Sequence, residues 1–233
     1  MIKSILILVS ISILSFSSEQ IVLVVSQDFN SSMAQMEYFQ GSTLVGTEIE
    51  VNIGKNGLGW GLGVIQFIQK TFEPLKYEGD NKAPIGVFKL TSIFGYASEN
   101  HYKMPYFHAS KNLICVDDSD SPDYNNLIIA NGDEKSFEYM RRKDTQYKVG
   151  IVVEHNKNAQ KRRGSCIFIH VQKGDNKPTS GCTSMKEDEI IKLVNWLDKS
   201  KNPILIQIPK SYAKEVLKLY PELKNSKLLK EED

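Results

Sequence analysis

The composition of the chain is that of an ordinary globular protein. Its 233 residues are 41% hydrophobic and 24% charged, which excludes a disordered chain, a collagen-like chain and a bundle of membrane helices. The 29 basic and 28 acidic residues leave a formal net charge of +1, so the chain lacks the positive field that holds a polyanion. We therefore expect no nucleic-acid partner.

The N-terminal segment, residues 1–17, has the profile of a signal peptide. Lys3 is followed by an apolar stretch from Ile5 to Phe16, which at about a dozen residues is shorter than the roughly 20 that a membrane-spanning helix requires. Small residues at Ser15 and Ser17 indicate cleavage after Ser17. An uncleaved anchor or a buried helix is the alternative. We expect a protein that is exported to the periplasm or cell envelope.

Short strand-like segments follow the signal peptide, rich in β-branched and aromatic residues and separated by glycine or polar residues. The strict alternation from Glu48 to Ile53 predicts a strand with one buried and one solvated face. Lys55-Asn56-Gly57, just after it, has the pattern of a hairpin turn. The predicted strands are Ile21–Ser26, Met36–Gln40, Glu48–Ile53, Val64–Ile68, Gly86–Thr91, Leu113–Val116, Leu127–Ala130, Gly150–Glu154, Cys166–Val171 and Ile204–Ile208.

Helical periodicity is clear only in the C-terminal part of the chain. Lys186–Ser200 carries apolar residues at helical spacing, and Ser211–Leu223 has the pattern of a surface helix that precedes a charged tail. No repeat or long linker divides the chain. The sequence therefore predicts one mainly β domain, a β-rich α+β fold, with one helix near residue 186 and another at the C-terminus.

The three cysteines are too few for a disulfide framework, and their odd number leaves at least one thiol over in an oxidising compartment. Cys115 and Cys166 lie in apolar strand-like runs, where a cysteine is usually a small buried hydrophobe. The sequence leaves open whether these two cysteines pair. Cys182 lies in a small polar turn, where packing does not require sulfur. It is therefore the candidate for chemistry.

A cysteine nucleophile needs a base, a group that fixes the base, and donors for the oxyanion. His170 ends an apolar strand, and a loop of turn-forming residues brings the chain back to Cys182. Gly181 allows a sharp turn that points backbone amides at an oxyanion. Ser184 and Glu187 have capping-box spacing for a helix whose N-terminus would lower the pKa of the thiol. The alternative is a core histidine and a small buried cysteine.

The segment Thr179-Ser180-Gly181-Cys182 resembles the signature of the YkuD-type L,D-transpeptidases, exported bacterial enzymes that remodel peptidoglycan. In that signature a histidine precedes a loop, then Ser or Thr, one further residue, Gly and the nucleophilic Cys. A second segment, Glu78 to Phe88, is similar to the family's other recurrent segment, in which Pro, Gly and Phe open a strand. The resemblance covers about Gln20 to Pro209 and points to a divergent subgroup with Gly-Cys-Thr-x-Met. It implies a β-sandwich catalytic domain over residues 18–209, with residues 210–233 forming a C-terminal helix and tail.

The resemblance also implies roles for individual residues. Cys182 would attack the carbonyl of the third stem residue, typically a diaminopimelate L-centre, and expel the terminal D-alanine, while His170 transfers the protons. The carbonyl of Val171 would orient the imidazole, and the amides of Gly181 and Cys182 would bind the oxyanion. The partners would be peptidoglycan stem peptides. An amine that resolves the thioester gives a 3–3 crosslink, and water makes the enzyme an L,D-carboxypeptidase.

The chain departs from the family pattern in three places. Ser180 replaces the usual histidine, Ser184 replaces the usual Asn or Arg, and the loop after His170 is short. We expect Ser180, Thr183 and His155 to bind substrate, with a surface role as the alternative for His155. The departures leave two further alternatives open, a non-catalytic peptidoglycan-binding module and a structural partner of envelope proteins. No cysteine or histidine pair has zinc spacing, so we expect no metal. We also expect that the protein has no cofactor and is a monomer.

Overall fold

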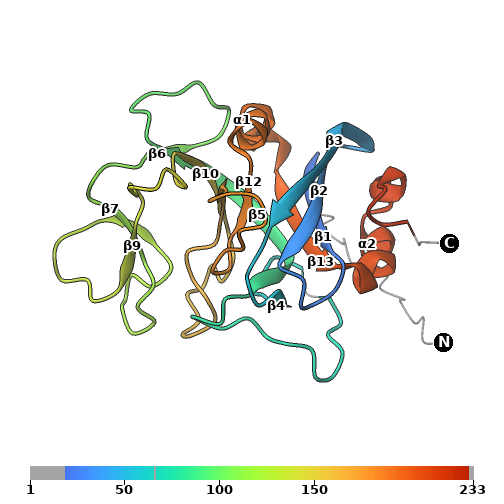
Figure 1. Cartoon of the computed structure of the whole chain (residues 1–233), viewed down its shortest axis with the longest axis horizontal. Coiled ribbons are helices and arrows are strands. Elements are labelled where there is room, and N and C mark those ends of the chain that lie inside the picture. The colour runs from blue at the N-terminus through green and yellow to red at the C-terminus, as the bar shows by residue number, and fades with distance from the viewer. Residues whose placement is uncertain (1–18, 66, 231–233) are drawn as a thin grey trace, which may run out of the picture.

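The computed structural model describes residues 19–65 and 67–230, so the predicted signal peptide, residues 1–17, lies outside the described part of the chain. Most of the strands form one large sheet, and three form a small sheet at one end of the molecule (Figure 1). The strands of the large sheet are β1 (Gln20–Ser26), β2 (Met33–Gln40), β3 (Thr43–Asn52), β4 (Leu58–Trp60), β5 (Ala83–Gly95), β6 (Tyr106–His108), β10 (Val149–Val153), β11 (Phe168–Val171), β12 (Thr183–Met185) and β13 (Ile204–Pro209).

The large sheet closes on itself. Its strands follow the order β10-β11-β12-β3-β2-β1-β13-β5-β4, β6 pairs with β5, and β10 pairs with β5 as well as with β11. The strands β1 and β13 are parallel, and all their residues are buried, as expected for mostly apolar strands of this kind. The closed sheet surrounds the main hydrophobic core. The mainly β fold expected from the sequence is confirmed.

The predicted strand Val64–Ile68 is wrong. Residues 64, 65, 67 and 68 form only an isolated bridge, between Ile65 and Val87 of β5. The backbone approaches β5 very closely here, since a Cβ added to Gly63 would lie 2.1 Å from the carbonyl oxygen of Val87. The chain is therefore held against β5 by a few backbone hydrogen bonds, such as that from the Val64 N–H to the Val87 carbonyl, without forming a strand.

The expected hairpin at Lys55-Asn56-Gly57 is also wrong, although a turn is present. The Gly57 N–H donates to the Gly54 carbonyl over 2.8 Å, and the φ of Gly57, +74°, is favourable for glycine. The strands on either side of the turn do not pair with each other, because β3 pairs with β2 and β12 while β4 pairs with β5. The turn therefore moves the chain from one part of the closed sheet to another.

Helix α1 (Glu187–Trp196) buries Ile190, Leu193 and Val194 and packs on β10 and β11. It ends before the predicted boundary at Ser200, because Lys199–Lys201 forms a separate 3-10 turn in which the Asp198 side chain accepts from the Ser200 N–H. The predicted C-terminal helix Ser211–Leu223 is divided into a 3-10 turn (Lys210–Tyr212), α2 (Ala213–Leu219) and a second 3-10 turn (Pro221–Asn225). The helix α2 ends just before Pro221, because a proline has no N–H to donate to the preceding turn of a helix.

The small sheet has the order β8-β7-β9, with β7 (Leu113–Val116) between β8 (Leu127–Ile129) and β9 (Phe137–Tyr139). A disulfide joins Cys115 of β7 to Cys166, which precedes β11, and so ties the small sheet to the large one. The question that the sequence left open, whether these cysteines pair, is answered by this bond. Within the described residues, no helix is both long enough and apolar enough to cross a membrane.

Candidate active site

The parallel pairing of β11 with β12 brings the two ends of the predicted catalytic loop together. Ile169 lies opposite Thr183, and His170 lies opposite Ser184. Because successive side chains of a strand point to opposite faces, His170 and Ser184 share one face, while Thr183 shares the other with Ile169. Cys182 immediately precedes β12. The connection between β11 and β12 carries the chain back to the end of the sheet at which β11 begins, as parallel neighbours require.

His170 is held by its own neighbour. Its Nδ1 lies 2.8 Å from the carbonyl oxygen of Val171, and its ring packs edge-on against Tyr147 at a centroid distance of 5.2 Å. A carbonyl can only accept, so Nδ1 carries the proton and Nε2 keeps a free lone pair. Burial lowers the pKa of His170 to about 4, so the ring is neutral at pH 7. Val171 thus occupies the position that the resemblance assigned to the orienting carbonyl.

The Cys182 sulfur is in contact with the backbone just before and within β11. It accepts from the Phe168 N–H at 3.3 Å and donates to the Cys166 carbonyl at 3.5 Å. Within residues 19–65 and 67–230, no hydrogen bond joins it to the ring of His170. Burial, together with the charge of Glu138, raises the pKa of the thiol to about 12. The resting site therefore consists of a protonated thiol and a neutral imidazole.

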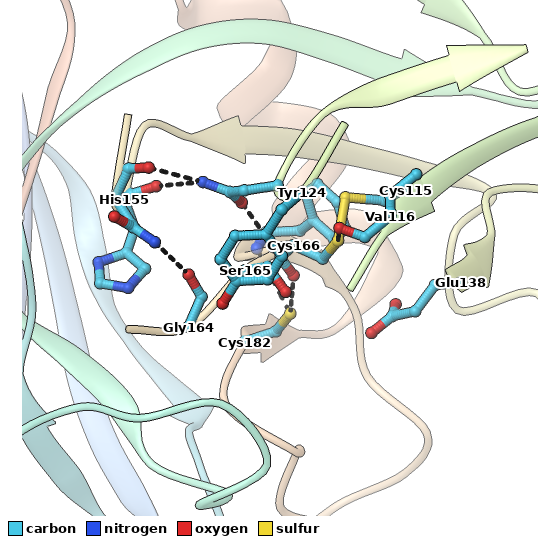
Figure 2. The surroundings of a disulfide bond; sticks show 12 residues. Cys115, Val116, Tyr124, Glu138, His155, Gly164, Ser165, Cys166 and Cys182 are labelled. Carbon is cyan, nitrogen blue, oxygen red and sulfur yellow. Dashed lines mark hydrogen bonds between the residues drawn. A yellow bond between two sulfur atoms is a disulfide. The ribbon is translucent and has the colours of Figure 1, made fainter. Parts of the chain in front are cut away.

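Glu138 and Tyr147 are two polar residues of this site that no sequence pattern indicated. Glu138 belongs to β9 of the small sheet, and Figure 2 shows its side chain extending toward the side on which Cys182 lies. The Tyr147 hydroxyl donates to the Glu138 carboxylate at 2.6 Å. Burial raises the pKa of Glu138. The small sheet therefore places a half-buried carboxyl group near the nucleophile.

The turn before Cys182 is fixed by Thr179. Its hydroxyl donates to the Cys182 carbonyl at 2.6 Å and accepts from the Gly181 N–H at 3.0 Å. The φ of Gly181 is +146°, and a Cβ there would lie 2.9 Å from the carbonyl oxygen of Lys82, so only glycine fits. The Gly181 amide, expected to bind the oxyanion, is engaged by Thr179 in this state. Ser180 is exposed beside it.

The expected cap of α1 is wrong. Ser184 lies inside β12 and not at a helix start, and the residue at the N-cap is Lys186, which makes no side-chain cap hydrogen bond. The pairing of β12 with β11 keeps the chain extended beyond Cys182, so the thiol does not lie at the positive end of a helix. The Ser184 hydroxyl is buried and has no hydrogen-bond partner among the described residues.

Two of the three expected substrate-binding residues have structural partners instead. Thr183 points into the core and its hydroxyl donates to Gln207 at 2.8 Å. The Nδ1 of His155 accepts from the Leu62 N–H at 3.2 Å, and its Nε2 lies 2.9 Å from the Arg163 carbonyl. Both side chains are almost completely buried. These positions do not support contact between either side chain and a substrate.

A cavity of about 310 Å³ lies beside the disulfide, between the small sheet and β10. Its lining includes Cys115, Cys166, Phe168 and Asn125, but neither Cys182 nor His170. Asn125 Oδ1 accepts from the Cys166 N–H at 2.9 Å. Figure 2 shows the Cys182 sulfur directed at Cys166, whose carbonyl accepts from the thiol. The segment from Cys166 to Phe168 therefore separates the cavity from the nucleophile.

No group of three His, Cys, Asp or Glu side chains in the described part of the chain is arranged to hold a metal ion. The site itself offers a thiol and an imidazole with a free Nε2. Such a set is that of nucleophilic acyl transfer, in which a thioester forms and is then resolved.

One family model agrees with this chemistry. The L,D-transpeptidase catalytic domain (YkuD) matches residues 21–206, which is most of the chain. No curated protein matches it. Among solved structures, the chain is similar to a mutant of the helical cell shape determining protein Pgp2 from Campylobacter jejuni, at 13% sequence identity and a TM-score of 0.42. That similarity covers 83% of this chain and 48% of the Pgp2 chain, so the chain spans less than half the length of that structure.

Proposed function

Because the chain belongs to the YkuD family of L,D-transpeptidase catalytic domains, we propose that it is an exported cysteine acyltransferase that acts on peptidoglycan stem peptides. The family implies L,D-transpeptidase-type activity on peptidoglycan. In this function Cys182 forms the thioester, and His170 transfers the protons. The acyl donor is a tetrapeptide stem whose terminal residue is D-alanine.

One observation carries the assignment of the two residues. The pairing of β11 with β12 fixes His170 next to Ser184, two residues from Cys182, while the Val171 carbonyl fixes the Nδ1 proton. The free lone pair of Nε2 can therefore take the thiol proton without a change of tautomer. A core histidine would satisfy both nitrogens, as His155 does through Leu62 and Arg163. His170 satisfies Nδ1 through Val171.

The reaction has two steps, formation of a thioester on Cys182 and its resolution by an amine. The Cys182 thiol gives its proton to His170 Nε2, and the thiolate adds to the carbonyl carbon of the third stem residue. The C–N bond to D-alanine breaks, and the amine leaves with the proton from His170. A thioester remains on Cys182. An amine of a neighbouring stem then attacks the thioester, gives its proton to His170, and releases the thiol with a new 3–3 amide bond.

The reaction also requires a change from the resting state. The Cys182 sulfur must leave the Phe168 N–H and the Cys166 carbonyl before it can meet His170. Glu138, from β9 of the small sheet, and Tyr147, from the segment before β10, cover the same region. We propose that a bound stem peptide displaces this cover, so that the thiol becomes reactive only with substrate present.

The experiment is incubation of the purified protein, with its disulfide intact, with a disaccharide tetrapeptide, followed by mass spectrometry of the products. We expect free D-alanine and a crosslinked dimer, and no products with Cys182→Ala. A tripeptide without dimer would identify an L,D-carboxypeptidase. If neither product forms with folded protein, the chain binds peptidoglycan without turning it over, and the acyltransferase proposal is wrong.

A further inference from the structure

Lys76 is a lysine almost completely removed from solvent, with 3% of its surface exposed. It lies between β4 and β5 in the chain, and its backbone N–H donates to the Trp60 carbonyl at 2.9 Å. Burying an ammonium group is costly unless partners compensate for the lost water. A position that keeps such a charge in the interior therefore calls for a physical reason beyond packing.

The partners of this ammonium group are few and close. Lys76 Nζ donates to the Tyr77 carbonyl at 2.7 Å and to Asp80 Oδ1 at 2.6 Å. The Asp80 carboxylate also accepts from the backbone N–H groups of Tyr77 and Lys82, at 2.7 and 2.8 Å. Its negative charge is thus shared among several donors. An ammonium has three N–H groups, and only two have protein acceptors among the described residues.

The ammonium group of Lys76 lies close to the turn that carries the nucleophile. A Cβ built on Gly181 would lie 3.7 Å from Lys76 Nζ, which places the charge beside the residue that precedes Cys182. The charged and titratable groups that act on the thiol are Glu138, which raises its pKa, and Lys76 and Arg142, which lower it. Lys76 acts from the segment between β4 and β5 of the large sheet, and Glu138 acts from β9 of the small sheet. The thiol therefore lies between opposite charges carried by two different parts of the fold.

We propose that Lys76 is a positioning residue of this site, whose buried ammonium group holds the Gly181 turn and stabilises the thiolate form of Cys182. This inference rests on the proposed function, in which the thiolate is the nucleophile. In that function, when the cover from the small sheet moves away, the Glu138 carboxylate moves with it while Lys76 stays on the large sheet. The balance of charge around the sulfur then favours the thiolate at the moment when substrate is bound.

The test is the rate at which Cys182 is alkylated, measured by mass spectrometry on oxidised protein at pH 8.5. With Cys115 and Cys166 in a disulfide, Cys182 is the remaining thiol. We expect Lys76→Met to slow alkylation by iodoacetamide at least fivefold. Alkylation by iodoacetate should slow further still, because that reagent is an anion and loses the attraction of the ammonium group. Lys76→Arg should restore both rates to within about twofold of the wild type, as a retained charge requires.

The matched control is Lys82→Met, which removes a lysine of the same segment whose ammonium donates to the Asn56 carbonyl at 2.7 Å. We expect this variant to keep both alkylation rates. A purely structural role for Lys76 makes the opposite prediction, because a loosened site exposes the thiol and speeds alkylation. Lys76→Gln, which keeps a donor but not the charge, replaces Lys76→Met if the latter does not fold.

The outcomes separate this inference from the proposed function. A folded Lys76→Met or Lys76→Gln protein with unchanged or faster alkylation, or with an unchanged ratio of the two reagents, overturns the role of Lys76 and leaves the acyl transfer untouched. A wild-type protein that releases no D-alanine contradicts the proposed function, whatever the alkylation rates are.

Discussion

The sulfur of Cys182 accepts a hydrogen bond from the backbone N–H of Phe168 across 3.3 Å. This contact turns the thiol toward the start of β11, and the carbonyl of Cys166 completes its surroundings there. A neutral, covered thiol is protected from oxidation and alkylation, because the thiolate is the reactive form. In the resting structure the nucleophile is therefore present in an unreactive form, kept there by the backbone groups that contact the sulfur.

Acid should destabilise the fold through its buried histidines. Burial lowers the pKa of His170 and of His155 from 6.5 to about 4, so between these values the unfolded chain binds more protons than the folded one. Stability should fall as the pH drops from 6.5 to 4, by about 3 kcal/mol for each histidine. Urea unfolding of wild type and His170→Asn checks this, since the variant should lose roughly half of the pH dependence. A wild-type stability that is flat over this range would contradict the burial of neutral imidazoles.

Ser184→Ala should be neutral or stabilising. The serine hydroxyl is buried without a partner, so its removal relieves a desolvation cost of about 1 kcal/mol. Thr183→Val is the matched control in the same strand, because it removes the buried hydrogen bond to Gln207 and should cost about 1 to 3 kcal/mol. Chemical denaturation of the two variants measures both effects. A loss of 1 kcal/mol or more with Ser184→Ala would restore the capping role that the structure rejects.

Gly181→Ala should distort the turn that carries the nucleophile. The backbone has a φ of +146°, and the new Cβ would lie 2.9 Å from the Lys82 carbonyl, so the substitution should cost about 1 to 3 kcal/mol. Gly174→Ala, in the same loop, meets only the Lys177 side chain at 3.5 Å and should have little effect. The two midpoints of thermal unfolding give the comparison. Equal midpoints would mean that the turn accommodates a side chain.

The disulfide should stabilise the fold and keep the small sheet over the thiol. It closes a loop with a sequence separation of 51 residues, for which chain entropy gives a stabilisation of about 4 kcal/mol. The double variant Cys115→Ala with Cys166→Ala should therefore unfold at lower urea concentration and expose Cys182 to faster alkylation. Protected and slow-reacting Cys182 in the folded double variant would show that the small sheet covers the thiol without the bond.

The sequence predicted the elements of this fold where local pattern decides them. β1 and β13 are mostly apolar runs of strand length, and the polar turn around Cys182 offers sulfur no packing role. The prediction of a helix cap at Ser184 is wrong because a long-range pairing, that of β12 with β11, keeps the chain extended at that residue. Lys76 and Glu138 could not be found from the sequence, because their position beside Cys182 depends on contacts between distant segments.

The most direct test of the account is where the acyl group resides when the protein meets its donor. Purified protein is mixed with a disaccharide tetrapeptide, quenched in acid within seconds and digested, and the adduct is located by mass spectrometry. The account predicts a thioester of the disaccharide tripeptide on Cys182, absent from Cys182→Ala and much reduced in His170→Ala. An adduct on Ser180 or Ser184, or D-alanine release that survives Cys182→Ala, would contradict it.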